Sequence, residues 1–539
     1  PSRDMTLVGI TGTNGKTTTS YLLESMFLAA GCTCGVIGTI NIRYNGKTRD
    51  NPITTPDAIA LQRTLSHMKQ AGVTHVIMEV SSHGLDQFRV DGCRFDAGVY
   101  TNLSQDHLDY HPDMETYFSC KQRFFTELLP PSGKTVSAPA VINVDDPWGE
   151  KLADSLHYPV IRVGCSKTAD VTAKDIVDTI QGISGRIFLE KDALSFASAL
   201  TGRFNLENIL CAAGAAYVLG ISPFHIQQGI ADCNGVPGRL EKVGTTINRY
   251  LFVDYAHTPD ALESTLKTLK QRAPGRVITV FGCGGDRDRS KRPLMGKIAC
   301  QYSDLAIVTS DNPRTENPDQ IVADIMKGIT AAPLPNDACN GPFTMNSAPL
   351  SGVMQQVDRK KALHTAVMIS RPNDIILAAG KGHETYQITN SGTIHFDDKE
   401  QLLDACSAFA EKFSPIAWNR ADLETGLCTS PVLDTLNADT VFAGISTDSR
   451  TINTNEVFVA LAGENFDGHD YIFDLVKKGI QAFVAQTGTY RTLESSIWDQ
   501  AKQNGILLFE TPDTLAAFGR LGRFQRLRSG VKVLAITGS

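Results

Sequence analysis

Long apolar runs, basic blocks and paired cysteines are absent from this sequence of 539 residues. No apolar run approaches the length of a membrane-spanning helix, and the opening residues show no signal-peptide pattern, so we expect no membrane insertion. The net charge is −7 without any basic block. This charge argues against a nucleic-acid partner or an anionic-membrane surface and leaves room only for a local basic pocket.

The 12 cysteines are scattered along the chain. Cys32 and Cys34 lie close together, but the sequence contains no CxxC pair and no spacing typical of His/Cys metal ligands. We therefore expect reduced thiols and a cytoplasmic location. The length allows several domains of ordinary size, and the 42% apolar content is sufficient for large cores.

A glycine-rich segment, Gly12-Thr13-Asn14-Gly15-Lys16-Thr17-Thr18, lies between a predicted buried strand at 7–10 and a helical pattern at 20–28. Strand, glycine loop, Lys-Thr and helix, in this order, are typical of a phosphate-binding loop. Its backbone N–H groups and the helix N-terminus would attract an anion. Lys16 would hold the β- and γ-phosphates, and Thr17 would hold Mg²⁺. The pattern is a shortened variant because Ile10 replaces a glycine, and the alternative is a glycine turn with a surface lysine.

The alternation of apolar runs and helical patterns predicts βαβ units and a parallel sheet in residues 1–235. We predict a second, smaller α/β domain at 236–412, with strands near 250–254, 276–281, 305–309 and 374–382. A third, mixed α and β unit is expected at 416–529. The tail at 533–539 repeats the opening at 8–13, so residues 530–539 should begin a second ATP-binding domain, and both ends look trimmed.

Two polar residues follow predicted strands of the first domain. Glu79 ends a buried strand at 73–80, and His107 follows another at 97–102. Ligands gather at the carboxyl ends of the strands in open parallel sheets, so both side chains should reach the rim that carries the phosphate loop. Together with Thr17 they could position one or two Mg²⁺ ions around a nucleotide. The alternative is that they are solvated or core side chains.

Four ordered motifs resemble the Mur ligase family: Gly12-Thr13-Asn14-Gly15-Lys16-Thr17, Glu79-Val80-Ser81-Ser82-His83-Gly84-Leu85, Asn102-Leu103-Ser104-Gln105-Asp106-His107-Leu108-Asp109 and Asp254-Tyr255-Ala256-His257-Thr258-Pro259. This family contains ATP-dependent ligases that build the peptide of bacterial cell-wall precursors. The resemblance covers essentially the whole chain, and residues 1–412 look like the MurE type. It implies an α/β fold, with a parallel-sheet P-loop ATPase central domain and a Rossmann-like C-terminal ligase domain.

The resemblance also implies ATP as co-substrate, Mg²⁺ as cofactor and a set of site residues. The ATP contacts would be Gly12, Thr13, Asn14, Gly15, Lys16, Thr17, Thr18, Asn205, Asn208, Arg239 and Asp254. The metal ligands would be Thr17, Glu79, His107 and Lys121, the last as a carbamate, since an ammonium would repel Mg²⁺. Lys16, Lys121 and His107 would be catalytic. The muramoyl-peptide substrate would be held by Thr54, Thr55, Ser81, Gln87 and Arg89.

The segment Asp311-Asn312-Pro313-Arg314 should select the added amino acid. Ligases with arginine at the fourth position resemble the group that adds meso-diaminopimelate. Diaminopimelate differs from lysine by a second carboxylate, which a guanidinium can bind through two hydrogen bonds. Arg287, Gly380 and Glu384 match the remaining contacts. The alternative is that Arg314 is a surface turn residue.

The third unit contains three segments, 445–450, 457–461 and 467–469, that resemble the N-terminal domain of a Mur ligase, which holds the UDP-sugar. The tail favours the MurF type, which adds D-alanyl-D-alanine. We therefore expect a MurE–MurF fusion, in which the MurE half lacks its N-terminal domain and the MurF half lacks its ATP site. A permuted MurE, with its N-terminal domain moved to the end, is the alternative.

The resemblance implies that ATP phosphorylates the D-glutamate carboxylate of UDP-MurNAc-L-Ala-D-Glu. The amine of meso-diaminopimelate would then attack the acyl phosphate after a domain closure that excludes water. A folylpolyglutamate synthetase would use the same chemistry on a pteroyl substrate, but the segments at 311–314 and 448–450 argue against it. A P-loop NTPase switch or a non-catalytic binding module is the other alternative, and ATP hydrolysis without any amino-acid dependence would favour it.

Overall fold

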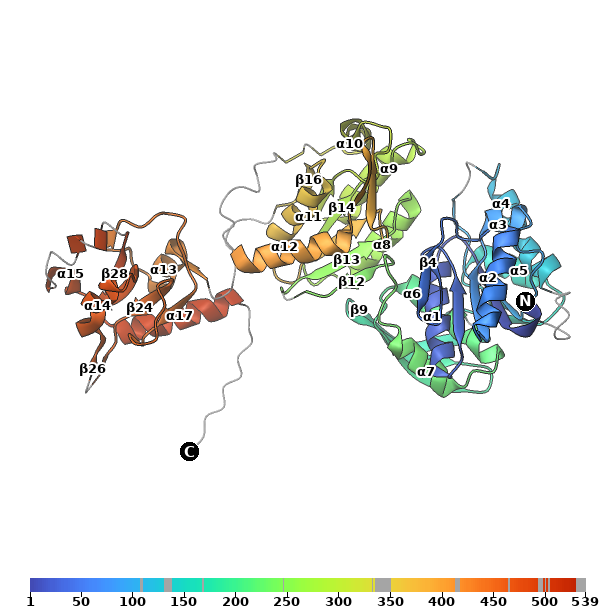
Figure 1. Cartoon of the computed structure of the whole chain (residues 1–539), viewed down its shortest axis with the longest axis horizontal. Helices are drawn as coiled ribbons and strands as arrows, with labels where there is room; N and C mark the ends of the chain where they lie inside the picture. Colours follow the sequence, from blue (N-terminus) through green and yellow to red (C-terminus); the bar gives the residue numbers. More distant parts are fainter. Residues whose placement is uncertain are drawn as a thin grey trace. The chain divides into compact units, whose positions relative to one another are not determined.

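The computed structural model describes residues 1–106, 110–129, 138–166, 169–245, 247–331, 333–334, 350–412, 417–463, 466–492, 498–499, 501–502 and 505–529. The chain forms two compact units, residues 1–405 and 406–539. The first unit contains two large sheets, drawn in blue to cyan and in green to orange in Figure 1. The candidate site residues all belong to this first unit.

The first large sheet is organised around its central strand β1 (Thr6–Thr11). Val8 and Ile10 pack in one apolar cluster and Leu7 in another, so both faces of the sheet are covered. In the described residues the strand order is β4-β3-β2-β5-β1-β6-β7-β8, and the neighbours from β2 to β8 run parallel. The other strands are β2 (Cys34–Ile37), β3 (Asn41–Tyr44), β4 (Lys47–Asp50), β5 (His75–Glu79), β6 (Ala97–Tyr100), β7 (Ala140–Asn143) and β8 (Val160–Val163).

Helices cover both faces of this sheet. One of them begins directly at the end of the glycine loop, with Gly15 as its left-handed N-cap. The helical segments are η1 (Ser2–Asp4), α1 (Lys16–Ala29), α2 (Ala58–Gln70), α3 (Ser82–Asp86), α4 (Met114–Arg123), η2 (Phe124–Leu128), α5 (Pro147–Ser155), α6 (Arg203–Val218) and α7 (Pro223–Asp232).

A separate antiparallel sheet interrupts the expected βαβ pattern. It consists of β9 (Thr172–Thr179), β10 (Gly182–Phe188) and β11 (Ala193–Ser198), in the order β11-β10-β9. The prediction of parallel βαβ units throughout residues 1–235 is wrong here. The physical reason is period-two alternation: Leu194 and Phe196 are buried, whereas their neighbours along β11 are exposed.

The second large sheet has the order β12-β13-β17-β14-β15-β16 in the described residues, and only β12 runs antiparallel. Its strands are β12 (Glu241–Val243), β13 (Tyr250–Asp254), β14 (Val277–Phe281), β15 (Leu305–Val308), β16 (Gly352–Gln355) and β17 (Ile375–Ala379), and a hairpin of β18 (Tyr386–Thr389) and β19 (Gly392–His395) follows. Its helices are α8 (Pro259–Arg272), α9 (Lys291–Tyr302), α10 (Pro318–Met326), α11 (Arg359–Met368) and α12 (Asp398–Lys412).

The second unit has a smaller sheet in the order β21-β28-β27-β24-β23, parallel except for β21. The strands of the second unit are β20 (Trp418–Asn419), β21 (Leu433–Asp434), β22 (Val441–Phe442), β23 (Gly444–Ser446), β24 (Glu456–Val459), β25 (Ala462–Gly463), β26 (Phe466–Asp467), β27 (Ala482–Gln486) and β28 (Leu507–Thr511). Of these, β20 pairs with β22 and β25 pairs with β26 in separate two-stranded sheets. Its helices are α13 (Arg420–Leu427), η4 (Gly468–Tyr471), α14 (Ile472–Lys477), α15 (Thr489–Thr492) and α17 (Thr514–Ser529).

The α/β fold class predicted from the sequence is confirmed by these sheets. Among the described residues, no helix has both the length and the apolar character that crossing a bilayer requires. Residues 530–539, which the sequence predicts to begin a second ATP-binding domain, lie outside the described residues. The predicted boundaries at 235/236 and 412/416 stay predictions.

Candidate functional site

The glycine loop follows β1 at the carboxyl edge of the sheet. Gly12 has φ +148° and Gly15 has φ +86°, backbone angles that residues with a side chain rarely adopt. A Cβ at Gly12 would lie 1.9 Å from Thr101 Oγ1, and one at Gly15 would lie 2.2 Å from Asn208 Oδ1. Both positions therefore require glycine, because neighbouring polar side chains fill the space where a Cβ would stand.

The loop is fixed by the strand beside it. The backbone N–H of Thr13 donates to the Asn102 carbonyl at 2.8 Å, and that of Asn14 donates to Asn102 Oδ1 at 2.9 Å. Sequence reasoning quoted Asn102 only as part of a motif and missed this role. Thr18 is buried in the first turn of α1, directly after the loop.

Two lysines converge on one carbonyl of this loop. Lys16 Nζ donates to the Gly12 carbonyl oxygen at 2.8 Å, and Lys121 Nζ donates to the same oxygen at 3.0 Å. Lys121 is 1% exposed, and its Nζ lies 4.6 Å from the centre of the Tyr117 ring. Burial, and then the charge of Lys16, lowers the pKa of Lys121 well below its usual value. A lowered pKa favours the neutral amine, which is the form able to react with CO₂.

Glu79 ends β5 with its carboxylate facing the start of α1. Thr17 Oγ1 donates to Glu79 Oε2 at 3.1 Å, and the Thr39 hydroxyl and N–H donate at 2.7 and 3.1 Å. The hydroxyls of Thr39 and Thr54 lie 3.1 Å apart, which brings a predicted substrate residue to the same place. His107, predicted as a metal ligand, lies outside the described residues.

Within the described ranges, no three His, Cys, Asp or Glu side chains form a ready-made metal cluster. The oxygens of Thr17 and Glu79 nevertheless fit Mg²⁺, which is bound through one or two carboxylates and keeps several waters. The donor set is hard and oxygen-rich, as this ion requires.

The other predicted substrate residues form one connected group beside Glu79. The hydroxyls of Thr55 and Ser81 lie 3.1 Å apart, and Thr55 Oγ1 donates to the Glu79 carbonyl at 2.9 Å. Arg89 donates through Nη1 to the Thr55 carbonyl at 2.8 Å and through Nε to Gln87 Oε1 at 3.0 Å. The structure therefore brings all of them to the rim that carries the loop.

Asn205 and Asn208 lie on α6, with Asn208 against the phosphate loop. Asn208 Nδ2 donates to Asn205 Oδ1 at 3.3 Å, and Asn205 Nδ2 donates to the Thr201 carbonyl at 2.8 Å. Both side chains are buried. The hydrogen bonds at the start of α6 thus fix the side-chain rotamers of Asn205 and Asn208, the two predicted ATP contacts on this helix.

The structure assigns different environments to Arg239 and Asp254. The Asp254 carboxylate accepts the N–H groups of Leu240 and Ala256 at 2.5 and 2.9 Å, and burial raises its pKa. The Arg239 guanidinium lies 4.6 Å from the centre of the Tyr255 ring, and its buried Nε has no hydrogen-bond partner. Asp254 therefore holds the backbone around Arg239, and the Arg239 guanidinium packs on the Tyr255 ring.

Asn312 and Glu384 form the centre of the predicted amino-acid pocket. Asn312 Nδ2 donates to Glu384 Oε2 at 2.7 Å, and burial raises the pKa of Glu384. A Cβ at Gly380, where φ is +112°, would lie 2.5 Å from Asp311 Oδ2. Sequence reasoning missed Lys381, which is fully buried and donates to Glu384 Oε2 at 3.4 Å and to Asn312 Oδ1 at 3.5 Å. Its position after β17 was the available signal.

Arg314 and Arg287, the two arginines predicted to bind the amino acid, both lie beside Gly284. A Cβ at Gly284 would lie 2.9 Å from Arg314 Nη1 and 3.7 Å from Arg287 Cγ. Arg314 has φ +53°, and its Nη1 donates to the Gly285 carbonyl at 2.8 Å. The exposed Arg287 donates to the Asp286 carbonyl at 3.3 Å. Both guanidinium groups therefore rest on loop carbonyls close to one another.

Three Mur ligase profiles match the chain: "Mur ligase middle domain" at residues 10–216, "Mur ligase, glutamate ligase domain" at 238–382 and "Mur ligase family, catalytic domain" at 441–522. The UDP-N-acetylmuramoyl-L-alanyl-D-glutamate–2,6-diaminopimelate ligase of Geobacter metallireducens is 49% identical over 412 residues, which covers 76% of this chain and 80% of that protein. The ligase of the same name from Bacillus cereus is 43% identical over 405 residues and covers 75% and 79%.

Solved structures agree with these matches. A UDP-N-acetylmuramoyl-L-alanyl-D-glutamate–2,6-diaminopimelate ligase superposes with a TM-score of 0.54 at 35% identity, covering 75% of this chain and 78% of that one. MurF from Acinetobacter baumannii superposes with a TM-score of 0.55 at 14% identity, covering 75% and 77%, and shares the fold. The chain therefore belongs to the Mur ligase family of ATP-dependent, ADP-forming ligases and resembles its MurE type.

Proposed function

We propose that residues 1–412 add meso-diaminopimelate to the D-glutamate carboxylate of UDP-MurNAc-L-Ala-D-Glu. The observation that carries this proposal is the cluster around Gly284, where Arg314 and Arg287 lie close to the hydrogen-bonded group formed by Asn312, Glu384 and Lys381. Its charges suit a zwitterionic far end, with a guanidinium for the carboxylate and Glu384 for the ammonium. The relatives that carry diaminopimelate in their names support the same substrate.

The phosphate loop supplies the energy-coupling half of the reaction. Lys16 leaves the Gly12 carbonyl and neutralises charge on the β- and γ-phosphates of ATP while the substrate carboxylate is phosphorylated. Lys121, as the carbamate formed from its neutral amine and CO₂, presents an anion toward the loop. Thr17 and Glu79, with His107, would hold Mg²⁺, which neutralises phosphate charge when bound. The diaminopimelate amine then attacks the acyl phosphate and releases phosphate.

We also propose that residues 416–529 hold the UDP end of a muramoyl-peptide for a MurF-type ligase, so that the chain is part of a MurE–MurF fusion. A Mur ligase profile matches 441–522 within this unit. The segment Ala535-Ile536-Thr537-Gly538-Ser539 supports the proposal because it repeats the entry to the glycine loop at residues 8–13.

ADP release measured with UDP-MurNAc-L-Ala-D-Glu and a panel of amino acids tests the main proposal. We expect release that depends on meso-diaminopimelate and is far weaker with lysine. Release that depends on glutamate and a pteroyl substrate would favour a folylpolyglutamate synthetase instead. Hydrolysis that is indifferent to every amino acid would favour a P-loop NTPase switch and overturn the ligase proposal.

A further inference from the structure

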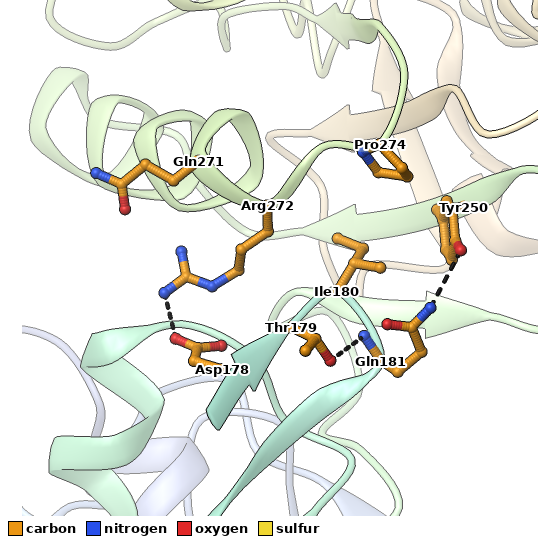
Figure 2. A pocket seen from close by; sticks show the side chains of 8 residues that line it. All are labelled: Asp178, Thr179, Ile180, Gln181, Tyr250, Gln271, Arg272 and Pro274. Carbon is orange, nitrogen blue, oxygen red and sulfur yellow. Dashed lines mark hydrogen bonds and ion pairs between the residues drawn. The ribbon is translucent and has the colours of Figure 1, made fainter. Parts of the chain in front are cut away.

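The tip of the β9–β10 hairpin docks onto the domain built on the second large sheet. Ile180 is buried in the apolar cluster that contains Leu266 and Leu269 of α8. Gln181 Nε2 donates to the Tyr250 hydroxyl at 3.1 Å. Figure 2 shows Ile180, Gln181 and Tyr250 among the residues that line a cavity of about 290 Å³, together with Gln271 and Arg272 at the end of α8. The hairpin that sequence reasoning missed is therefore a structural link within the first unit.

Asp178 is the charged centre of this link. Its Oδ2 forms an ion pair with Arg272, the last residue of α8, and the two side chains are only 15% and 13% exposed (Figure 2). Its Oδ1 accepts the Thr201 hydroxyl and the Gly202 N–H, both at 3.2 Å. One carboxylate thus joins the end of a helix in the second domain to the start of α6 in the first.

The start of α6 leads directly to the nucleotide side of the site. The Thr201 carbonyl accepts Asn205 Nδ2 at 2.8 Å, and Asn205 Oδ1 accepts Asn208 Nδ2 at 3.3 Å. Asn208 in turn packs against Gly15, where no Cβ could fit. Gly202 has no room either, because its Cβ would lie 2.6 Å from Thr268 Cγ2 on α8. The contacts from Asp178 to the phosphate loop are continuous.

The opposite end of α8 also reaches candidate nucleotide residues. The helix begins at its N-cap Thr258, four residues after Asp254, and its 14 residues span about 21 Å. A rotation of the second domain therefore moves the Asp254 segment and Arg272 together. The Asp178–Arg272 pair is the charged contact through which that motion would reach α6.

We propose that Asp178 and Arg272 are positioning residues for the nucleotide: their ion pair sets the start of α6, and through it Asn205 and Asn208, according to the orientation of the second domain. The proposal rests on the proposed function, since it assumes that ATP binds beside α6. Removing the guanidinium leaves Asp178 bonded only to the first domain, so the charged link between α8 and the start of α6 is lost while the packing of Gly202 against Thr268 remains. The buried Arg272 Nε has no hydrogen-bond partner, so its terminal bonds to Asp178 and to the Thr268 carbonyl hold the group.

The test compares Arg272→Gln with Arg276→Gln in the full chain. Arg276 pairs with Asp374 at 2.6 Å with similar shielding, but every partner of Arg276 lies within the second domain, which makes it a matched control. We expect Arg272→Gln to weaken binding of a non-hydrolysable ATP analogue about three- to tenfold and to raise the KM for ATP without raising that for the amino acid. Arg272→Lys should restore most of the affinity, and Arg276→Gln should lower the melting temperature while leaving nucleotide binding unchanged.

Asp178→Asn provides a second, independent variant, because an asparagine oxygen can still accept Thr201 and Gly202 while its amide group faces Arg272. We expect it to weaken nucleotide binding, and the double variant with Arg272→Gln to be no worse than either single variant. Unchanged nucleotide affinity in both single variants, or equal effects of Arg272→Gln and Arg276→Gln, would overturn the positioning role. Failure of the wild type itself to bind nucleotide would overturn the proposed function as well.

Discussion

Substitution of Arg314 by alanine tests how the chain chooses its amino acid. The proposed role of the guanidinium is to bind the carboxylate that diaminopimelate has and lysine lacks. We expect the variant to lose kcat/KM for diaminopimelate selectively, while the KM values for ATP and the UDP substrate stay unchanged. The ratio of kcat/KM for diaminopimelate to that for lysine is the quantity to measure.

The magnitude follows from what Arg314 contacts in the absence of substrate. A charge-assisted hydrogen bond contributes about 1.5–3 kcal/mol. Arg314 Nη1 already donates to the Gly285 carbonyl at 2.8 Å, and giving up that bond costs about 0.5–1.5 kcal/mol. The net effect is therefore about 1–1.5 kcal/mol, which corresponds to a roughly five- to twelvefold loss. Alanine keeps a Cβ at φ +53°, so the backbone strain is the same in both proteins.

Arg289→Ala is the control, because Arg289 is 70% exposed and its guanidinium pairs with Glu316 at 3.1 Å. This substitution removes the same charge as Arg314→Ala and should leave the ratio of kcat/KM for diaminopimelate to that for lysine unchanged. If Arg314→Ala also leaves the ratio unchanged, or lowers both amino acids equally together with the melting temperature, then Arg314 merely stabilises its turn. The assignment of diaminopimelate would fall with that result.

Three further changes probe the loop, the buried lysine and a neighbouring ion pair. Lys16→Ala should lower ADP release on the order of 10²–10³-fold at an unchanged melting temperature, because the partners of Lys16 Nζ among the described residues are the loop carbonyls of Gly12 and Thr13; near-normal release would exclude it from the ATP site. Lys121→Ala should cost on the order of 10- to 100-fold, and bicarbonate should reactivate CO₂-depleted wild type but never the variant. A hydrogen bond from Arg292 holds the pKa of Glu316 at about 2, against 4.5 for the free carboxyl. The ionised Glu316 therefore contributes its full stabilisation above about pH 4.5 and loses it as the pH falls toward 2. Across this range, the urea midpoint of unfolding should fall less steeply with pH for Glu316→Gln than for the wild type.

The regular part of the fold was predictable because its strands are continuous apolar runs. The expected strand at 250–254 coincides with β13, and that at 305–309 differs from β15 by one residue. Both are buried on two faces, as parallel strands require. The antiparallel hairpin at 172–188 was missed because its strands are short of apolar residues and partly exposed, so they did not stand out from a helical or loop pattern.

The candidate site was predictable where function depends on residue type at a fixed spacing. Lys16, Thr17 and Glu79 meet as the motif order implies. Lys381 was not predicted, since its partners Asn312 and Glu384 come together only through the pairing of strands far apart in sequence. The same limit applies to Asp178 and Arg272, which are separated by 94 positions and form an ion pair only because two domains are in contact.

The carbonyl of Gly12 is one acceptor shared by two donors, Lys16 and Lys121. A ligand that drew Lys16 away from this oxygen would leave the acceptor to Lys121 alone, so the hydrogen bonding of one lysine depends on the position of the other. By thermodynamic reciprocity, the effect of such a ligand on the chemical state of Lys121 equals the effect of that state on the affinity for the ligand. A shared backbone acceptor thus makes the two lysines one coupled unit rather than two independent groups.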